Sequence, residues 1–300
     1  MNNIILKQIV FNDFYKMVER VFSESRIPFR FSKYSNGMYN NFVHVFLLVL
    51  KEKYKQSYRG LVELADNLNI RQMLGLLKVP HFTTLQKFIS RLDKDLLVKL
   101  VRVCYKILNL TNIKSAIDGT GFDNTHPSMY YQNKYSVNKG YKNYINTHII
   151  TDLYTKLILN IDTCNHRKHD SQFFIPLIEP LKQQLSCVLA DRGYDSMELR
   201  EFCWNNKITN HIDFRNFGPV RTNNKNRNNA KKRFRRKVYR KRSIVESVIS
   251  AVKRRFGDFV TSRKQDNQQK QVILKVLAYN ITILGKYKQN TFCLFIFILE

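Results

Sequence analysis

Apolar residues recur every three or four positions through roughly the first 110 residues of the chain. This period places them on one face of a helix, and strand-like alternation is absent from this part of the sequence. We therefore expect an all-helical N-terminal domain over residues 1–112. The spacing is clearest in residues 40–54, 58–68 and 85–108.

Short helices joined by polar turns leave two interpretations of this domain open. One interpretation is a helix-turn-helix, and DNA binding is the function that we expect for this domain. The other interpretation is a small helical bundle that serves only to pack against the rest of the chain. Thr83, followed by Gln86 just ahead of an apolar run, resembles a capping box. This pair predicts that a helix begins near Thr83.

From about Lys114 onward the pattern changes to short β-rich runs separated by helical stretches. The order β-β-β-α-β-α-β predicts an antiparallel meander to which later strands add in parallel through helical crossovers. We expect an α/β domain over residues 113–290 with a mixed five-stranded sheet flanked by helices. The expected strands span residues 114–118, 144–152, 156–162, 186–191 and 208–214, and the expected helices span residues 170–185, 196–206, 238–256 and 268–288.

Two features of this pattern concern single segments. Asp170 stands where an N-cap is expected, just before the first helical stretch of the α/β domain. The last ten residues, TFCLFIFILE, form a β-prone run. We treat residues 291–300 as a C-terminal tail, either an added strand or a fortuitous extension, and assign no function to it.

Positive charge is concentrated in one part of the chain. The sequence has 51 Lys and Arg against 23 Asp and Glu, a net charge of +28. Residues 221–264 contribute 17 basic and 2 acidic residues, which is more than half of that excess. We therefore expect an acidic partner, such as a nucleic acid, and a basic DNA-binding loop over residues 216–238. Candidate DNA contacts in and beside it are Arg235, Arg236, Arg240 and Lys241.

Several classes of protein are disfavoured by what the sequence lacks. Its longest apolar runs are too short to cross a bilayer, and its start lacks a basic leader and a cleavage site, so we expect a cytoplasmic protein without a membrane partner. Five scattered cysteines without a C-x-x-C pair argue against a disulfide framework and a zinc ribbon. Without a G-x-G-x-x-G or a G-x-x-x-x-G-K motif, we expect no nucleotide cofactor.

Two aspartates follow apolar strands, Asp118 in SAIDGT and Asp191 in SCVLADRGYD. If the first and fourth strands are neighbours, both carboxylates reach one spot at the sheet edge and can share a divalent cation through oxygen ligands. The alternative is that each aspartate only forms a turn at the end of a strand.

One helix carries a third acid among cations. Tyr239, Arg242, Glu246 and Lys253 follow one another at offsets of 3, 7 and 14, which confines them to an arc of about 60° on a helix. Glu246 is then either a third metal ligand flanked by phosphate-binding side chains or a member of weak surface ion pairs on a solvated helix. Three acids around divalent ions suit the cleavage of phosphodiesters.

Two further clusters remain open. Cys164, His166 and His169 have the spacing of a transition-metal site but lack a fourth ligand, and a strand-to-helix turn near the active site explains them as well. A set of tyrosines lies among lysines that include Lys142, a candidate DNA contact. These tyrosines either stack on bases or pack within the domain, and they are Tyr130, Tyr131, Tyr135, Tyr141 and Tyr144.

The spacing Y-x2-R-x3-E-x6-K resembles the YREK signature of prokaryotic insertion-sequence transposases of the DDE class. IDGT around Asp118 and ADRGYD around Asp191 resemble the first and second aspartate motifs of that group, and NHRKHDS (residues 165–171) resembles its His-Asp segment. Residues 57–92 are similar to its helical N-terminal region. The resemblance covers roughly residues 40–285.

The resemblance implies an RNase H-like catalytic domain and specific residue roles. Asp118, Asp191 and Glu246 would be catalytic and bind Mg²⁺ or Mn²⁺, as two ions. Arg242 and Lys253 would contact phosphates, and Tyr239 would support the DNA end. One departure is that only 54 residues separate Asp191 from Glu246, so the β-rich insertion of some relatives is missing and the basic loop would take over its DNA contacts.

The function that the resemblance implies is cut-and-paste DNA transposition. The protein would bind terminal inverted repeats as a homodimer, expose a 3′-OH by metal-dependent strand cleavage and join it to double-stranded target DNA. It would work in the prokaryotic cytoplasm, at the nucleoid. Two alternatives stay open, a non-catalytic DNA-binding repressor derived from a transposase and a metal-dependent nuclease without strand transfer.

Overall fold

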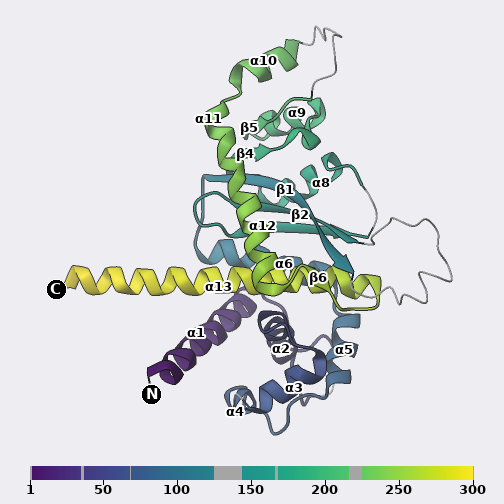
Figure 1. Cartoon of the computed structure of the whole chain (residues 1–300), viewed down its shortest axis with the longest axis vertical. Helices are drawn as coiled ribbons and strands as arrows, with labels where there is room; N and C mark the ends of the chain where they lie inside the picture. The colour runs from purple at the N-terminus through teal and green to yellow at the C-terminus, as the bar shows by residue number, and fades with distance from the viewer. Residues whose placement is uncertain are drawn as a thin grey trace, which may run out of the picture. The chain divides into compact units, whose positions relative to one another are not determined.

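The computed structural model (Figure 1) divides into two compact units, residues 1–107 with 254–300 and residues 108–253. We call them the helical unit and the sheet unit. The sequence placed residues 254–290 with the α/β domain, whereas their contacts group them with the N-terminal helices. The structure describes residues 2–34, 37–67, 69–124, 144–165, 168–215 and 225–299, with the backbone alone for residues 2–10, 225–226 and 288–299.

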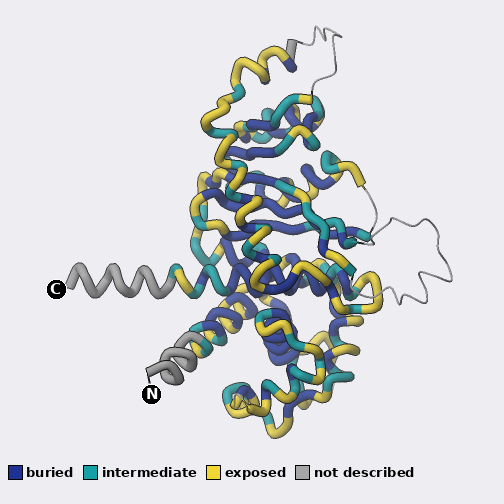
Figure 2. The backbone as a smooth tube through the Cα atoms, in the orientation of Figure 1, coloured by how far each residue is buried: buried dark blue, intermediate teal, exposed yellow. Residues whose placement is uncertain are grey.

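The core of the helical unit is formed by α2 and α13. Every residue of α2 from Asn41 to Glu52 is buried, and α13 is buried in the same way between Val272 and Ala278. Helices that are apolar all round belong in the interior of a domain, and Figure 2 shows α2 as a buried element. The elements of this unit are α1 (Asn2–Glu24), α2 (Asn41–Lys53), α3 (Tyr58–Asn67), α4 (Ile70–Met73), α5 (Phe82–Arg91), α6 (Lys94–Ile107), β6 (Phe259–Val260) and α13 (Gln265–Leu299).

A buried polar cluster joins these two central helices. The carboxylate of Glu52 on α2 lies 2.7 Å from the Lys51 ammonium and 3.3 Å from that of Lys275 on α13. Gln271 donates a further hydrogen bond to Glu52 at 3.4 Å. Buried charges require such partners because an unpaired one is strongly destabilising. The cluster is one of the contacts that join α13 to α2.

The sheet unit contains a mixed sheet of five strands in the order β3-β2-β1-β4-β5. β1 pairs antiparallel with β2 and β2 with β3, whereas β4 pairs parallel with β1 and β5 with β4. The predicted RNase H-like fold is thereby confirmed. Its elements are β1 (Ile113–Asn124), β2 (Tyr144–Asp152), β3 (Ile158–Cys164), α8 (Ser171–Ile178), η1 (Glu179–Leu181), β4 (Leu185–Ala190), η2 (Arg192–Tyr194), α9 (Met197–Asn205), β5 (Thr209–Ile212), α10 (Lys225–Arg233), α11 (Arg236–Tyr239), η3 (Arg240–Arg242) and α12 (Ser243–Phe256).

Helices cover different faces of this sheet. Directly paired residues of antiparallel strands point to the same face, so Gly119 of β1 shares a face with its partner His148, whose ring stacks on Phe173 of α8. The side chains of Asp118 and Phe122 point to the other face. There Phe122 meets Lys253 of α12, which places α12 across that face (Figure 1). The acidic side chain of β1 therefore points toward the α12 side.

Three details differ from the expectation. Asp118 does not end its strand, because β1 continues to Asn124 along β2. The N-cap of α5 is His81 instead of Thr83, since the His81 ring accepts the hydrogen bond of the Thr83 N–H. Finally, α13 runs to Leu299. The β-prone run predicted at residues 291–300 therefore does not form an added strand, because the helix continues through residue 299. A helix that is already nucleated extends at small cost per residue, which outweighs the weak β preference of this segment.

Among the residues described by the structure, none of the helices combines the length and the apolar character needed to cross a bilayer.

Candidate active site

The parallel pairing of β1 with β4 brings the two aspartates together. The last register pair of these strands is Ala116 with Leu189. Asp118 and Asp191 each follow two residues later, so an extended register would place them opposite each other at the carboxyl edge of β4. The predicted proximity of the two aspartates thus follows from the observed strand order.

A single arginine connects the first aspartate with the helix glutamate. The Arg242 Nη1 lies 3.1 Å from the Asp118 Oδ2, and its Nη2 bonds to the Glu246 Oε1. Arg242 ends η3 and Glu246 lies in the first turn of α12, so the two are separated by one helical turn and share a face. Three of the predicted site residues therefore meet at one point.

Negative charge is crowded at this point. Burial raises the pKa of the Asp118 carboxyl; the Arg242 guanidinium and a 3.0 Å hydrogen bond from the Gly119 N–H lower it, and the Asp191 and Glu246 carboxylates raise it. The net pKa lies above its usual range. Conversely, the pKa of Arg242 is raised, because the carboxylates outweigh the effect of its burial. The site carries more negative charge than the one arginine compensates.

Asp191 is held by the turn that follows β4. It is the N-cap of η2, and its Oδ1 accepts a 2.7 Å hydrogen bond from the Gly193 N–H. A Cβ on Gly193 would lie 2.8 Å from that Oδ1 and would also collide with the Asp170 carboxylate. Gly193 therefore lets a fourth carboxylate, that of Asp170, approach Asp191. Asp170 does stand at the N-cap of α8, but its side chain makes no capping hydrogen bond.

A buried histidine lies on the opposite face of β1. The His148 Nδ1 is 2.6 Å from the Tyr194 hydroxyl, and the ring stacks on Phe173 with centroids 3.9 Å apart. Its Nε2 has no hydrogen-bond partner among the residues that the structure describes and lies 3.8 Å from Asp170. Burial lowers the pKa of His148 to about 4, so the ring is neutral at pH 7. Sequence reasoning missed His148, because an alternating strand gives no signal that separates it from its neighbours.

The remaining residues of the signature lie at different distances from the carboxylates. Tyr239 packs its ring 5.3 Å from that of Phe234 and interacts with Arg242, which connects it to the site. Lys253 lies three turns along α12 from Arg242, with its ammonium 5.3 Å from the centre of the Phe122 ring. The structure thus brings Tyr239 and Arg242 to the carboxylates and leaves Lys253 farther along β1.

The four predicted DNA contacts between residues 235 and 241 are exposed, and several other candidates lie outside the described residues. Arg235, Arg236, Arg240 and Lys241 all face solvent. Lys142, His166, the basic-loop residues 216–224 and four of the candidate tyrosines lie outside the described residues. Cys164 is buried and His169 is exposed.

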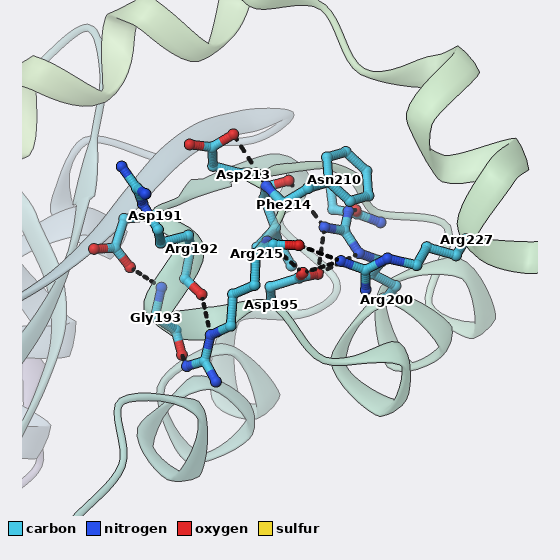
Figure 3. A network of polar contacts seen from close by, with 11 residues as sticks. Asp191, Arg192, Gly193, Asp195, Arg200, Asn210, Asp213, Phe214, Arg215 and Arg227 are labelled. Carbon is cyan, nitrogen blue, oxygen red and sulfur yellow. Dashed lines mark hydrogen bonds and ion pairs between the residues drawn. The ribbon is translucent and has the colours of Figure 1, made fainter. Parts of the chain in front are cut away.

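A second acid close to the site has a different character. The buried Asp195 accepts hydrogen bonds from Arg200 at 2.8 Å, from Arg227 at 2.6 Å and from the backbone N–H of Arg215 at 2.8 Å (Figure 3). The Arg200 guanidinium also lies over the Phe214 ring at 4.1 Å. This cluster ties α9, β5 and the basic α10 together. Nothing in the sequence indicates that Asp195 is a buried structural acid, because it lies in the same short motif as Asp191.

The cluster also contacts the turn that carries Asp191. The Arg215 side chain donates hydrogen bonds to the carbonyls of Arg192 at 2.8 Å and Gly193 at 2.7 Å, as Figure 3 shows. These carbonyls belong to η2, whose N–H group at Gly193 holds Asp191. The position of the second aspartate is therefore coupled to the Asp195 cluster.

The donor set is chemically suited to a divalent cation. Asp118, Asp191 and Glu246 offer hard oxygen ligands, and their mutual repulsion favours an added positive charge. Within the described residues, no three His, Cys, Asp or Glu side chains are arranged closely enough to hold an ion. The Arg242 guanidinium bonds to two of the three carboxylates instead.

A mixed sheet with two aspartates on neighbouring strands and a facing helix glutamate defines an RNase H-like domain with an acidic site at the carboxyl end of β4, which we call the acidic edge site. The sequence profile described as "Transposase DDE domain" matches residues 111–281, and the chain belongs to this family. Members of this family generally use divalent metal ions. An uncharacterized protein of Aquifex aeolicus (strain VF5) is 27% identical over 246 residues, covering 75% of each chain.

The chain is also similar to a solved structure, described as the cryo-EM structure of the piggyBac transposase synaptic complex with hairpin DNA. The sequences are 12% identical, the TM-score is 0.48, and the match covers 93% of this chain and 74% of that chain. A likeness this remote carries no argument about individual residues.

Proposed function

We propose that the chain is a transposase of a prokaryotic insertion sequence with a YREK signature, which cuts and rejoins DNA at the ends of its element. The observation that carries the proposal is the position of Arg242. Its guanidinium joins Asp118 on the sheet to Glu246 on the helix, next to the turn that holds Asp191. Three acids distant in the sequence thus share one electrostatic site.

Each residue of the site has a role in this proposal. Asp118, Asp191 and Glu246 would hold two Mg²⁺ or Mn²⁺ ions, which when bound activate water and stabilise the leaving oxygen. Arg242 would exchange its carboxylate partners for a phosphate of the bound DNA, because the guanidinium fits either anion in a bidentate manner. Tyr239 would support the DNA end, and Lys253 would contact the backbone.

The reaction has two steps that balance without an energy source. In the first step, water attacks a phosphodiester at the end of the element, and the broken P–O bond leaves a 3′-OH and a 5′-phosphate. In the second step, that 3′-OH attacks a target phosphodiester, so one P–O bond forms as one breaks. The partners are terminal inverted repeats and target DNA. Because two ends are processed together, we expect a homodimer on DNA.

The proposal is tested by removing one acid at a time without changing its shape. Asp191→Asn and Glu246→Gln are each expected to reduce Mg²⁺-dependent cleavage of an end-labelled terminal-repeat duplex by at least about 10³-fold. DNA binding is expected to remain, because the change removes negative charge. Glu198→Gln is the matched control, since Glu198 is exposed on α9 in the same unit. Cleavage at the wild-type rate by either site variant contradicts the proposal.

A second readout separates transposition from related activities. The wild-type protein is expected to join the cleaved end to a supercoiled target plasmid. Cleavage without joining would identify a nuclease that stops after hydrolysis. Binding without cleavage under every metal condition would identify a DNA-binding repressor.

A further inference from the structure

A wide basic groove lies within the helical unit. It has a volume of about 840 Å³ and is lined by α3, by α5 and by the segment that leads into α13. Every charged residue in its lining is a cation. These cations are Lys51, Arg59, Lys87, Arg91, Arg263 and Lys264.

Five of these six cations have no acidic partner within the described part of the chain. Lys51 is buried and paired with Glu52 at 2.7 Å, whereas the other five are exposed. Arg59 stacks over the Phe82 ring at 4.9 Å, and none of the five forms an ion pair with a residue that the structure describes. Gathered cations without local acids create a positive potential, which attracts a polyanion.

Neutral hydrogen-bonding groups accompany the charges. Thr83, Gln86 and Ser90 line the groove from α5, at a spacing of three, four and seven residues that keeps them on one face of the helix. Thr261, Ser262 and Asn267 line the opposite wall. Hydroxyl and amide groups of this kind also donate hydrogen bonds to phosphate and sugar oxygens.

The two walls are firmly joined. The Asn267 amide donates to the Ser90 hydroxyl at 3.1 Å, and the Lys270 ammonium donates to the Ile89 carbonyl at 3.1 Å. Lys94 of α6 bonds to Gln269 of α13 at 3.1 Å. The groove is therefore a built feature of the helical unit, and it exists only when the N-terminal helices and α13 are together.

We propose that this groove binds the phosphate backbone of duplex DNA, as a second DNA contact apart from the acidic edge site. The inference rests on the proposed function, since it takes DNA as the partner. Among polyanions, DNA is favoured over an acidic peptide because most of the residues that line the groove are basic or carry hydroxyl and amide groups, as in protein–DNA interfaces. The contact requires residues 261–267 in addition to the N-terminal helices.

The experiment neutralises the groove in the full-length protein. Lys87→Gln, Arg91→Gln and Lys264→Gln are combined, and binding to a labelled 30-base-pair duplex of arbitrary sequence is followed by fluorescence anisotropy across a salt series, without divalent metal. The triple variant is expected to bind at least about tenfold more weakly, with a salt slope reduced by about 1 to 3. Lys78→Gln, Lys99→Gln and Lys106→Gln form the matched control, because these lysines are exposed in the helical unit outside the groove.

Each outcome decides the matter. An equal loss in both triple variants, or no loss in the groove variant, overturns the proposal. So does a groove variant that binds DNA normally but loses binding of a poly-glutamate peptide. Thermal melting verifies that both variants are folded. Failure of the groove is distinguishable from failure of the transposase assignment, because the latter is decided by metal-dependent cleavage in Asp191→Asn and Glu246→Gln.

Discussion

Asp118 and Asp195 lie in the same unit, and both pair with arginine, yet the two sites are opposite in character. The Asp195 side chain is 0% exposed and accepts hydrogen bonds from Arg200, Arg227 and the Arg215 N–H. Burial raises the pKa of its carboxyl, but these hydrogen bonds outweigh burial and hold the pKa below its usual range. Asp195 is stably ionised and fully satisfied.

The Asp118 side chain is 20% exposed and has one arginine to share with Glu246. Its pKa is raised, first by burial and further by the neighbouring carboxylates. The difference shows that an acid with complete partners serves the fold, whereas an acid that is short of positive charge is available to a ligand. The same unit therefore contains a candidate catalytic acid, Asp118, and a structural acid, Asp195, which follows Asp191 by only four residues.

The largest expected effect comes from breaking the satisfied site. Asp195→Asn is expected to lower the free energy of unfolding by about 3–5 kcal/mol, because it leaves two buried guanidinium groups without a counter-charge. Urea unfolding at pH 7 measures the change. Asp123→Asn, at an exposed position of β1, serves as the control and is expected to change stability by less than about 0.5 kcal/mol. A small loss in Asp195→Asn would show that the cluster is not essential to the fold.

The buried His148 is expected to make the free energy of unfolding depend on pH. Its folded-state pKa of about 4 lies below the ordinary 6.5, so the folded state loses stability as the pH falls from 6.5 toward 4, because the unfolded ring takes up a proton that the buried ring does not. The loss is expected to reach up to about 3 kcal/mol. Unfolding free energies measured between pH 7 and pH 4 should fall less steeply in His148→Phe than in the wild type. Equal slopes would show that His148 does not carry this acid sensitivity.

A smaller effect is expected when the shared arginine is removed. Arg242→Gln is expected to tighten Mn²⁺ binding several-fold in the absence of DNA, because the guanidinium and the ion compete for Asp118 and Glu246. Isothermal titration calorimetry measures the dissociation constant. Arg240→Gln removes an exposed neighbouring cation and is the control. If binding is unchanged or weaker, Arg242 does not compete with the ion.

The smallest effect concerns the stability of the candidate catalytic site. An acid whose pKa is raised above 3.8 destabilises the folded state once it ionises, so Asp118→Asn is expected to raise the free energy of unfolding at pH 7 by up to about 1 kcal/mol. The gain should disappear as the pH falls below about 3.8. Chemical unfolding across this pH range checks both statements. A clear loss of stability at pH 7 would place Asp118 with Asp195 among the structural acids.

Much of the sheet unit was predictable from local pattern. The order of strands and helices permitted β1 and β4 to be parallel neighbours, and their observed pairing brings Asp118 and Asp191 together. The helical period placed Arg242 and Glu246 on one face of a helix. Helical and strand periods can be recognised in a sequence because they depend only on the polarity of residues a few positions apart.

Other features depended on contacts between distant segments. The assignment of α13 to the helical unit rests on its packing against α1, α2, α5 and α6, all of which are far from it in the sequence. The sequence singled out Asp170 as an N-cap and as part of the His-Asp segment, but neither its approach to Asp191 nor the position of His148 was visible in a local pattern. The groove combines α5 with residues 261–267, and neither segment alone predicts it.

The sequence by itself determined the types of element, the order of the strands and the identity of the three candidate acids, because periodicity and side-chain chemistry are local properties. Only the tertiary structure decided which acids are satisfied and which are not. Asp191 and Asp195 belong to the same short motif, but their surroundings come from β1, β5, α10 and η3, and the pKa and availability of a carboxylate depend on those surroundings.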